Sequence, residues 1–243
     1  MADASFSGPM ENVTMFHAGP MPVTRILVMS WLVMGLIVVG AAVVRARLRR
    51  RDPGRMQSVV EAMLDWLGAE IRGIINRDPW PFIPLVASLF LFILASNFVS
   101  FISSFFTFLT PPTADLNTTA ALATIVFLAV PFYGVAMSGA LRYLKTYVEP
   151  VWIMLPFNII SDLSRTLAMA VRLFGNIVSG EILFGVIVAL VPFFLLPLGT
   201  LPLMFLGLIT GTIQAYIFAV LTIVYIGGAV KVVEKHQKEE PSS

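Results

Sequence analysis

Residues 151–190 read VWIMLPFNIISDLSRTLAMAVRLFGNIVSGEILFGVIVAL, and Pro156 is the one strong helix terminator among them. The segment therefore predicts a helix of about 35 to 40 residues. At 1.5 Å per residue, such a helix is roughly 50 to 60 Å long, whereas the hydrocarbon core of a bilayer is about 30 Å thick. If the chain lies in a membrane, this helix must tilt steeply or curve.

The composition of the whole chain places it in a membrane. Hydrophobic residues make up 58% of the sequence and charged residues 12%, whereas soluble domains are about one quarter charged. The mean hydropathy is +0.88. A net charge of +2 gives no support for a nucleic-acid partner, and the absence of cysteine excludes disulfides and thiolate metal sites.

Four further apolar stretches are long enough to cross a bilayer. Including the segment above, we predict spans at 26–44, 82–109, 116–141, 150–190 and 200–232. Prolines and a glycine between the last two spans predict an outside turn near 192–202. The predicted fold is all-α: a single integral membrane domain over 1–243 with five crossings, the last two forming a long, steeply tilted hairpin.

Residues 54–77 differ from the spans because charged and apolar residues alternate at helical spacing. Apolar positions such as Val60, Leu64, Leu67 and Ile71 fall on one face. This pattern predicts an amphipathic helix at the cytoplasmic interface. The alternative, a surface helix of a soluble domain, lacks a soluble domain around it.

The distribution of basic residues predicts the orientation. Basic clusters at 45–55, 142–145 and 231–238 belong in the cytoplasm, whereas the loops at 107–115 and 191–202 contain no Lys or Arg. Five crossings then place the N-terminus outside and the C-terminus in the cytoplasm. A cleaved signal peptide would carry its basic residues before the first apolar stretch, but here they follow it.

Four charged residues interrupt the apolar segment 151–190, and such charges usually mark an ion or substrate path. Asp162 precedes Arg165 by three residues, which is salt-bridge spacing on a helix. Arg172 has no acidic residue three or four positions away, so its partner is expected on another helix or another chain. The alternative is a structural Arg172 that is paired within this chain.

The chemistry of Arg172 and Glu181 differs. Arginine stays protonated, so Arg172 cannot relay a proton but can hold a fixed positive potential in a low-dielectric place. A carboxyl group that approaches it would be driven to ionise. Glu181, nine residues later and about 180° around the helix, can take up and release protons if water reaches it.

Four motifs resemble subunit a of the F-type ATP synthases. RLFGN at 172–176 is followed by Gly180-Glu181, and PTADLNTT occupies 112–119. Gln214 lies 42 residues beyond Arg172, and PFNII at 156–160 resembles the opening of the family's long helix. The resemblance covers about residues 26–232, in the same order.

The resemblance implies a stator for rotary ion transport. Arg172 would face a ring of c subunits, between two offset aqueous half-channels that conduct protons, or sodium ions in a divergent branch. Glu181, Asn176 and Gln214 would line the outside half-channel, with Asp115 and Asn117 near its mouth, and Asp162 would serve the cytoplasmic one. The implied partners are the c-ring, the peripheral-stalk b subunits, the remaining synthase subunits and the lipid of a bacterial inner membrane.

The sequence departs from the family's pattern at three places. Ser161-Asp162 stands where many relatives have two acids, Thr166 stands where a proline is common, and Gly207 replaces a His or Glu found in some members. Gly207 and Gly211 form a GxxxG pattern that indicates either close helix packing or channel space.

Two rival functions explain less. A self-contained secondary transporter predicts internal repeats and paired discontinuous helices, which the sequence lacks. A membrane anchor or assembly factor gives no reason for Arg172 or Glu181. No phosphate-binding loop or catalytic metal motif is present, and His17 and His236 lie outside the spans. We therefore expect no cofactor, no metal and no catalysis by this chain alone.

Overall fold

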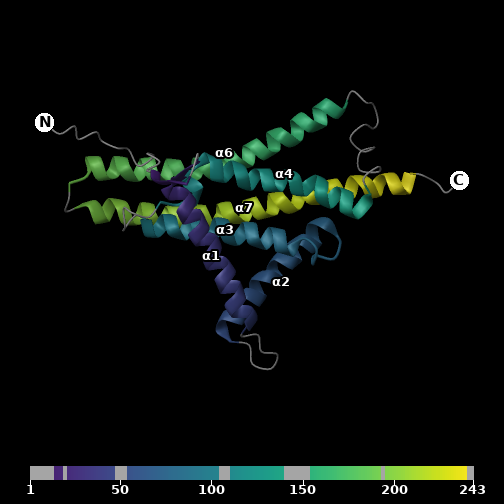
Figure 1. Cartoon of the computed structure of the whole chain (residues 1–243), viewed down its shortest axis with the longest axis horizontal. Coiled ribbons are helices and arrows are strands. Elements are labelled where there is room, and N and C mark those ends of the chain that lie inside the picture. The colour runs from purple at the N-terminus through teal and green to yellow at the C-terminus, as the bar shows by residue number, and fades with distance from the viewer. Residues whose placement is uncertain are drawn as a thin grey trace.

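The computed structural model describes residues 14–18, 21–46, 54–103, 110–139, 154–192 and 195–239. Figure 1 shows long helices that lie side by side, with α1 and α2 set obliquely to them. The elements are β1 (Thr14–Ala18), β2 (Met21–Thr24), α1 (Arg25–Ala46), α2 (Arg55–Ile75), α3 (Ile83–Ser103), the 3-10 helix η1 (Pro112–Ala114), α4 (Leu116–Ser138), α6 (Met154–Leu190) and α7 (Leu196–Glu239).

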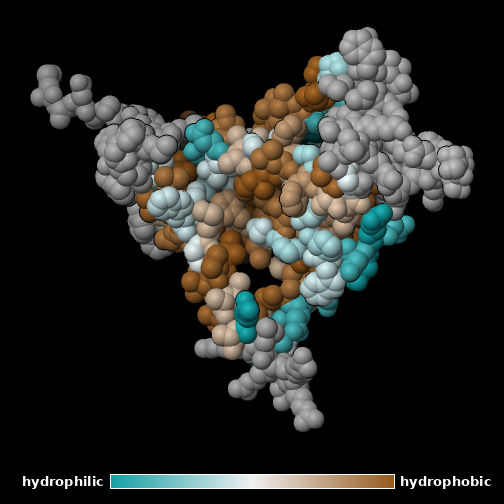
Figure 2. Space-filling model, turned by 45° about the vertical axis from the view of Figure 1, so that its right-hand side comes forward, coloured by the Kyte–Doolittle hydropathy of each residue, from teal (hydrophilic) through white to brown (hydrophobic). Residues whose placement is uncertain are grey.

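The prediction of an all-α membrane protein with five crossings is confirmed. Helices α1, α3, α4, α6 and α7 are each long and apolar enough to span a bilayer. Large hydrophobic side chains are exposed on all five, and Figure 2 shows hydrophobic residues gathered across the middle of one face. The one addition is the antiparallel pair β1–β2 before α1, which the sequence analysis did not predict.

The turn between the last two spans is shorter than predicted. Helix α6 ends at Leu190 and α7 begins at Leu196, so the chain is helical again before Gly199 and Pro202. Pro197 is compatible with this start because the first helical turn has no internal partner for its N–H groups. Of the predicted span 82–109, residues 104–109 lie outside the described residues, as do the predicted basic loop 142–145 and most of the cluster that follows α1.

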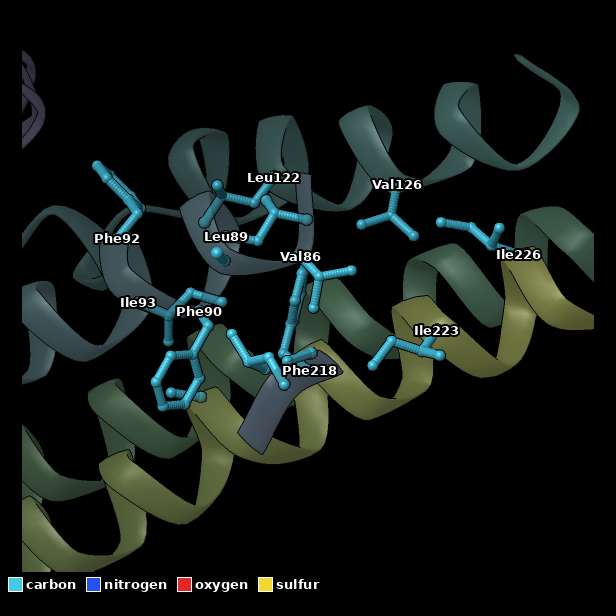
Figure 3. Packing of buried hydrophobic residues seen from close by; sticks show 14 of the residues in the cluster. Val86, Leu89, Phe90, Phe92, Ile93, Leu122, Val126, Phe218, Ile223 and Ile226 are labelled. Atoms are coloured by element: carbon cyan, nitrogen blue, oxygen red, sulfur yellow. The ribbon is translucent and has the colours of Figure 1, made fainter. Parts of the chain in front are cut away.

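Helix α7 lies at the centre of the core, in contact with α2, α3, α4 and α6. Its side chains Phe218, Ile223 and Ile226 meet those of α3 and α4, as Figure 3 shows. All three are almost completely buried. With little hydrophobic driving force between helices in lipid, this close packing is the main source of their association.

Helix α2 packs against the core through one end. The ring of Trp66 lies 5.8 Å from that of Phe90 in α3 and 5.4 Å from that of Tyr216 in α7. Leu67, Ile71 and Ile75 are buried on the same side, which matches the predicted apolar face. Its place at the cytoplasmic interface stays a prediction.

Helix α6 is attached to the bundle along only part of its length. Between 156 and 190, the buried side chains are Met169, Ala170, Leu173 and Ile177. No residue from 156 to 168 is buried, and in Figure 1 this first part of α6 points away from α4 and α7. With 37 and 44 residues, α6 and α7 are about 55 and 65 Å long, more than a bilayer thickness.

Candidate functional site

Two contacts fix how α6 and α7 face each other. The guanidinium carbon of Arg165 lies 5.8 Å from the centre of the Tyr225 ring. A Cβ placed on Gly199 would lie 3.1 Å from Cγ2 of Ile187. Because both helices rise equally per residue and run antiparallel, Gln214 comes level with Asn176, and Gly207 with Glu181, to within about one helical turn.

Arg172 lies on the exposed side of α6, away from the face that carries Leu173 and Ile177. Small residues surround it there, because Ala168, Gly175 and Ser179 share its side of the helix and are all exposed. Within the described residues, no acidic side chain forms an ion pair with Arg172. A neighbouring surface could therefore approach this guanidinium closely.

Glu181 lies about 13.5 Å along α6 from Arg172, and on the other side of the helix. It is partly buried. At the same height on α7, a Cβ placed on Gly207 would meet no atom within 4 Å. The structure thus leaves open space beside Gly207 at about the level of Glu181.

Asn176 and Gln214 stand between Glu181 and Arg172. Asn176 is partly buried, and its backbone carbonyl accepts a hydrogen bond from the Ser179 hydroxyl at 3.1 Å. Gln214 is buried on α7, with 8% of its surface exposed. Asn176 and Gln214 are thus polar residues of two neighbouring helices, at the same height to within about one helical turn.

The predicted pair of Asp162 and Arg165 is confirmed, since Oδ1 of Asp162 lies 3.7 Å from Nη1 of Arg165. The Asp162 side chain is 28% exposed and that of Arg165 57% exposed. Arg165 also contacts the Tyr225 ring of α7, within the range of a cation–π interaction. No pattern in the sequence indicates this second contact, because Tyr225 lies 60 positions away.

Asp115 and Asn117 are joined to each other rather than to the residues of α6. The Asp115 carboxylate caps α4 by accepting a hydrogen bond from the Asn117 backbone N–H at 3.1 Å. The Asn117 side-chain amide donates to the same oxygen at 3.2 Å. An aspartate at this position stabilises a helix start by about 1 kcal/mol. The segment that precedes it, η1, packs against α6.

The family model for the ATP synthase A chain matches residues 27–227, which include every residue of the candidate site. The chain belongs to the ATP synthase A chain family. It is 43% identical over 229 residues to ATP synthase subunit a 2 of Picosynechococcus sp., and the alignment covers 93% of this chain and 94% of that one.

Other relatives agree. ATP synthase subunit a 2 of Bradyrhizobium sp. is 39% identical over 229 residues, with 94% of this chain and 99% of the relative covered. ATP synthase subunit a 1 of Chlorobaculum parvum is 40% identical over 226 residues, with 93% and 96% covered. The predicted family is confirmed, and with it an ion-translocating membrane subunit of ATP synthase that is not catalytic by itself. Nothing supports the alternative of a secondary transporter.

Asn97 is a buried polar residue that was not predicted from the sequence. Asn97 in α3 is 3% exposed, and its side-chain amide donates a hydrogen bond to the Gly211 carbonyl of α7 at 2.6 Å. The signal was present, because an amide inside an otherwise apolar span needs a partner. The contact also settles the GxxxG pattern: Gly211 is closely packed, whereas Gly207 faces open space.

Proposed function

We propose that this chain is the stator that conducts protons to and from the carboxyl groups of a c-subunit ring, so that ion flow drives rotation and ATP synthesis. Peripheral-stalk b subunits would hold it against that rotation. Because each elementary charge that crosses 100 mV releases about 2.3 kcal/mol, several must pass for each ATP made. Nucleotide chemistry would belong to the partner subunits.

The observation that carries this proposal is the position of Arg172. Its fixed charge lies on an exposed side of α6, among small residues and without an acidic partner in the described part of the chain. A ring carboxyl that reaches this guanidinium would lose its proton, because a nearby positive charge favours the ionised form. The same charge would repel cations and prevent a direct leak between the two half-channels.

The other polar residues lie on both sides of Arg172 along α6. Glu181 is about 13.5 Å toward one end and Asp162 about 15 Å toward the other. We assign Glu181, Asn176 and Gln214 to the outside half-channel, with Asp115 and Asn117 at its mouth, and Asp162 to the cytoplasmic one. This spacing supports two paths that meet only at Arg172.

The orientation follows from the basic residues. Arg45 and Arg55 stand at the end of α1 and the start of α2, where the positive-inside rule places the cytoplasm. The N-terminus then lies outside and the C-terminus inside a bacterial inner membrane. A thiol reagent that cannot cross membranes tests this, because the chain has no cysteine of its own. A cysteine inserted directly after Gly54 should react with this reagent only when the reagent is added on the cytoplasmic side of the membrane.

The decisive experiment replaces Arg172 with alanine in the whole ATP synthase, in inverted membrane vesicles. Arg172→Ala should abolish ion-driven ATP synthesis and ATP-driven pumping, while ATP hydrolysis by the detached soluble sector survives. Arg165→Ala is the matched control, because it removes a charge from the same side of the same helix. Normal pumping by Arg172→Ala would refute the proposed function.

A further inference from the structure

Asn97 is a buried polar residue of α3 that contacts α7. With 3% of its surface exposed, its amide would be costly to bury without a partner. The 2.6 Å hydrogen bond to the Gly211 carbonyl satisfies one side of that amide. In the described residues, the amide oxygen Oδ1 has no such bond. Asn97 therefore contacts α7 through one specific donor.

Gly211 is shaped to receive this side chain. A Cβ placed on Gly211 would lie only 2.7 Å from Cγ of Asn97, closer than real contacts allow. Gly207, one turn earlier on the same face, has open space around it. Glycine at 211 thus permits the close approach of Asn97, and a Cβ there would collide with the Asn97 side chain and displace it from this position.

A second contact between α3 and α7 agrees with the first. The rings of Phe101 and Phe205 lie 5.8 Å apart. Moving four residues along α3, from Asn97 to Phe101, corresponds to moving six residues back along α7, as expected for antiparallel helices within about half a turn. Together the two contacts fix both the height and the rotation of α7 on α3.

The residue placed by this arrangement is Gln214. It follows Gly211 by three residues, so it lies on the same side of α7 about one turn further on, and it is buried. Gln214 is also about 60° around α7 from Gly211, and on α6 the residue at about its height, to within one helical turn, is Asn176. A slip of α7 by one turn would move Gln214 by about 5.4 Å and away from Asn176.

We propose that Asn97 is a positioning residue for ion transfer: its hydrogen bond to Gly211 sets the height and rotation of α7, and so places Gln214 opposite Asn176. This inference rests on the proposed function, in which these residues line the path between Glu181 and Arg172. Asn97 acts through α7 and need not contact the ion.

The test uses Asn97→Leu, which keeps the approximate volume and removes the donor, in vesicles that contain the whole synthase. Asn97→Leu should still assemble but slow ATP synthesis about tenfold. Because Asn97 acts through Gln214, the double variant Asn97→Leu/Gln214→Ala should be no more than about twofold slower than Gln214→Ala alone. Ser88→Leu is the control, since Ser88 is exposed and bonds only within α3.

Two results would overturn the inference: a normal rate in Asn97→Leu, or losses that multiply in the double variant. If Arg172→Ala still synthesises ATP, the proposed function itself fails. If Arg172→Ala is inactive while Asn97→Leu is normal, only the positioning role fails.

A second pair of variants decides the matter if Asn97→Leu does not assemble. Gly211→Ala should lose ATP synthesis because its methyl group collides with Asn97. Adding Asn97→Ser shortens the side chain but keeps a donor, so Asn97→Ser/Gly211→Ala should recover at least about tenfold of the lost rate. Absence of recovery contradicts the inference.

Discussion

Helices α6 and α7 form one antiparallel hairpin, yet they differ in burial. In an apolar stretch of 18 residues, 50% of α7 is buried but only 17% of α6. Helix α7 has no charged residue from Leu196 to Val230, whereas α6 carries two acids and two arginines. Three glycines of α7 each lie close to a different helix: Gly199 to α6, Gly211 to α3 and Gly227 to α2.

This difference in burial and charge indicates different roles for the two helices of the hairpin. Helix α7 contacts four other helices, so changes to its buried apolar side chains should affect folding and assembly. The charged residues of α6 are exposed or only partly buried, so changes in them should affect ion transfer while the subunit still assembles. The following variants test that division, in order of decreasing effect.

Glu181→Gln should have the largest effect. It keeps the shape of the side chain but removes the group that exchanges protons, so proton-driven ATP synthesis should fall on the order of a hundredfold. The amount of assembled synthase, measured by immunoblot of washed membranes, should not change. Glu181→Asp is the control and should keep most of the rate. A normal rate in Glu181→Gln would remove this carboxyl from the path.

Ile223→Ala tests the buried side of α7. Ile223 is completely buried, so the cavity should lower the free energy of unfolding in detergent by about 2 to 5 kcal/mol. Leu167→Ala in α6 is the matched change, because Leu167 is 62% exposed and should cost about 0.5 kcal/mol or less. Equal losses of stability in both variants would contradict the inference that burial distinguishes α7 from α6.

Two adjacent glycines of α7 give a finer test. A Cβ on Gly227 would lie 3.2 Å from Cγ1 of Ile75, whereas one on Gly228 would meet nothing within 4 Å. Gly227→Val should therefore lower the free energy of unfolding by about 1 to 3 kcal/mol, and Gly228→Val much less. If Gly228→Val is the more destabilising, the contact between α2 and α7 is not as described.

Arg165→Gln should have the smallest effect. The Arg165 side chain is 57% exposed, so its pair with Asp162 should be worth about 1 kcal/mol or less. ATP synthesis should stay within about twofold of the unchanged enzyme. A loss comparable to that of Arg172→Ala would mean that α6 carries two essential arginines and that the cytoplasmic path needs both members of the pair.

The sequence predicted the spans because hydrophobic length and charge are local properties. It also predicted the Asp162–Arg165 pair, whose partners are one turn apart. It could not give the heights of α6 and α7, since these depend on contacts between distant residues such as Arg165 and Tyr225. The amide of Asn97 in an apolar span indicates that it needs a partner, but the sequence does not identify that partner, because Gly211 lies 114 positions away.

For two predicted features, the structure shows contacts that sequence spacing did not predict. Asp115 and Asn117 were predicted near a channel mouth, and Asp115 also caps the start of α4 by accepting a hydrogen bond from the Asn117 N–H. Of the two glycines in GxxxG, one packs and the other does not. Sequence spacing identifies which residues share a face, but what lies opposite that face is a property of the folded chain.

The proposed function requires that the side of α6 that carries Arg172 faces the c-subunit ring, and cross-linking tests this requirement directly. Ala168 and Leu167 are adjacent and exposed, but Ala168 lies about 40° from Arg172 around the helix and Leu167 about 140°. In this cysteine-free chain, Ala168→Cys should cross-link to a cysteine beside the ring carboxyl, and Leu167→Cys should not. Cross-linking through Leu167→Cys alone would contradict the account.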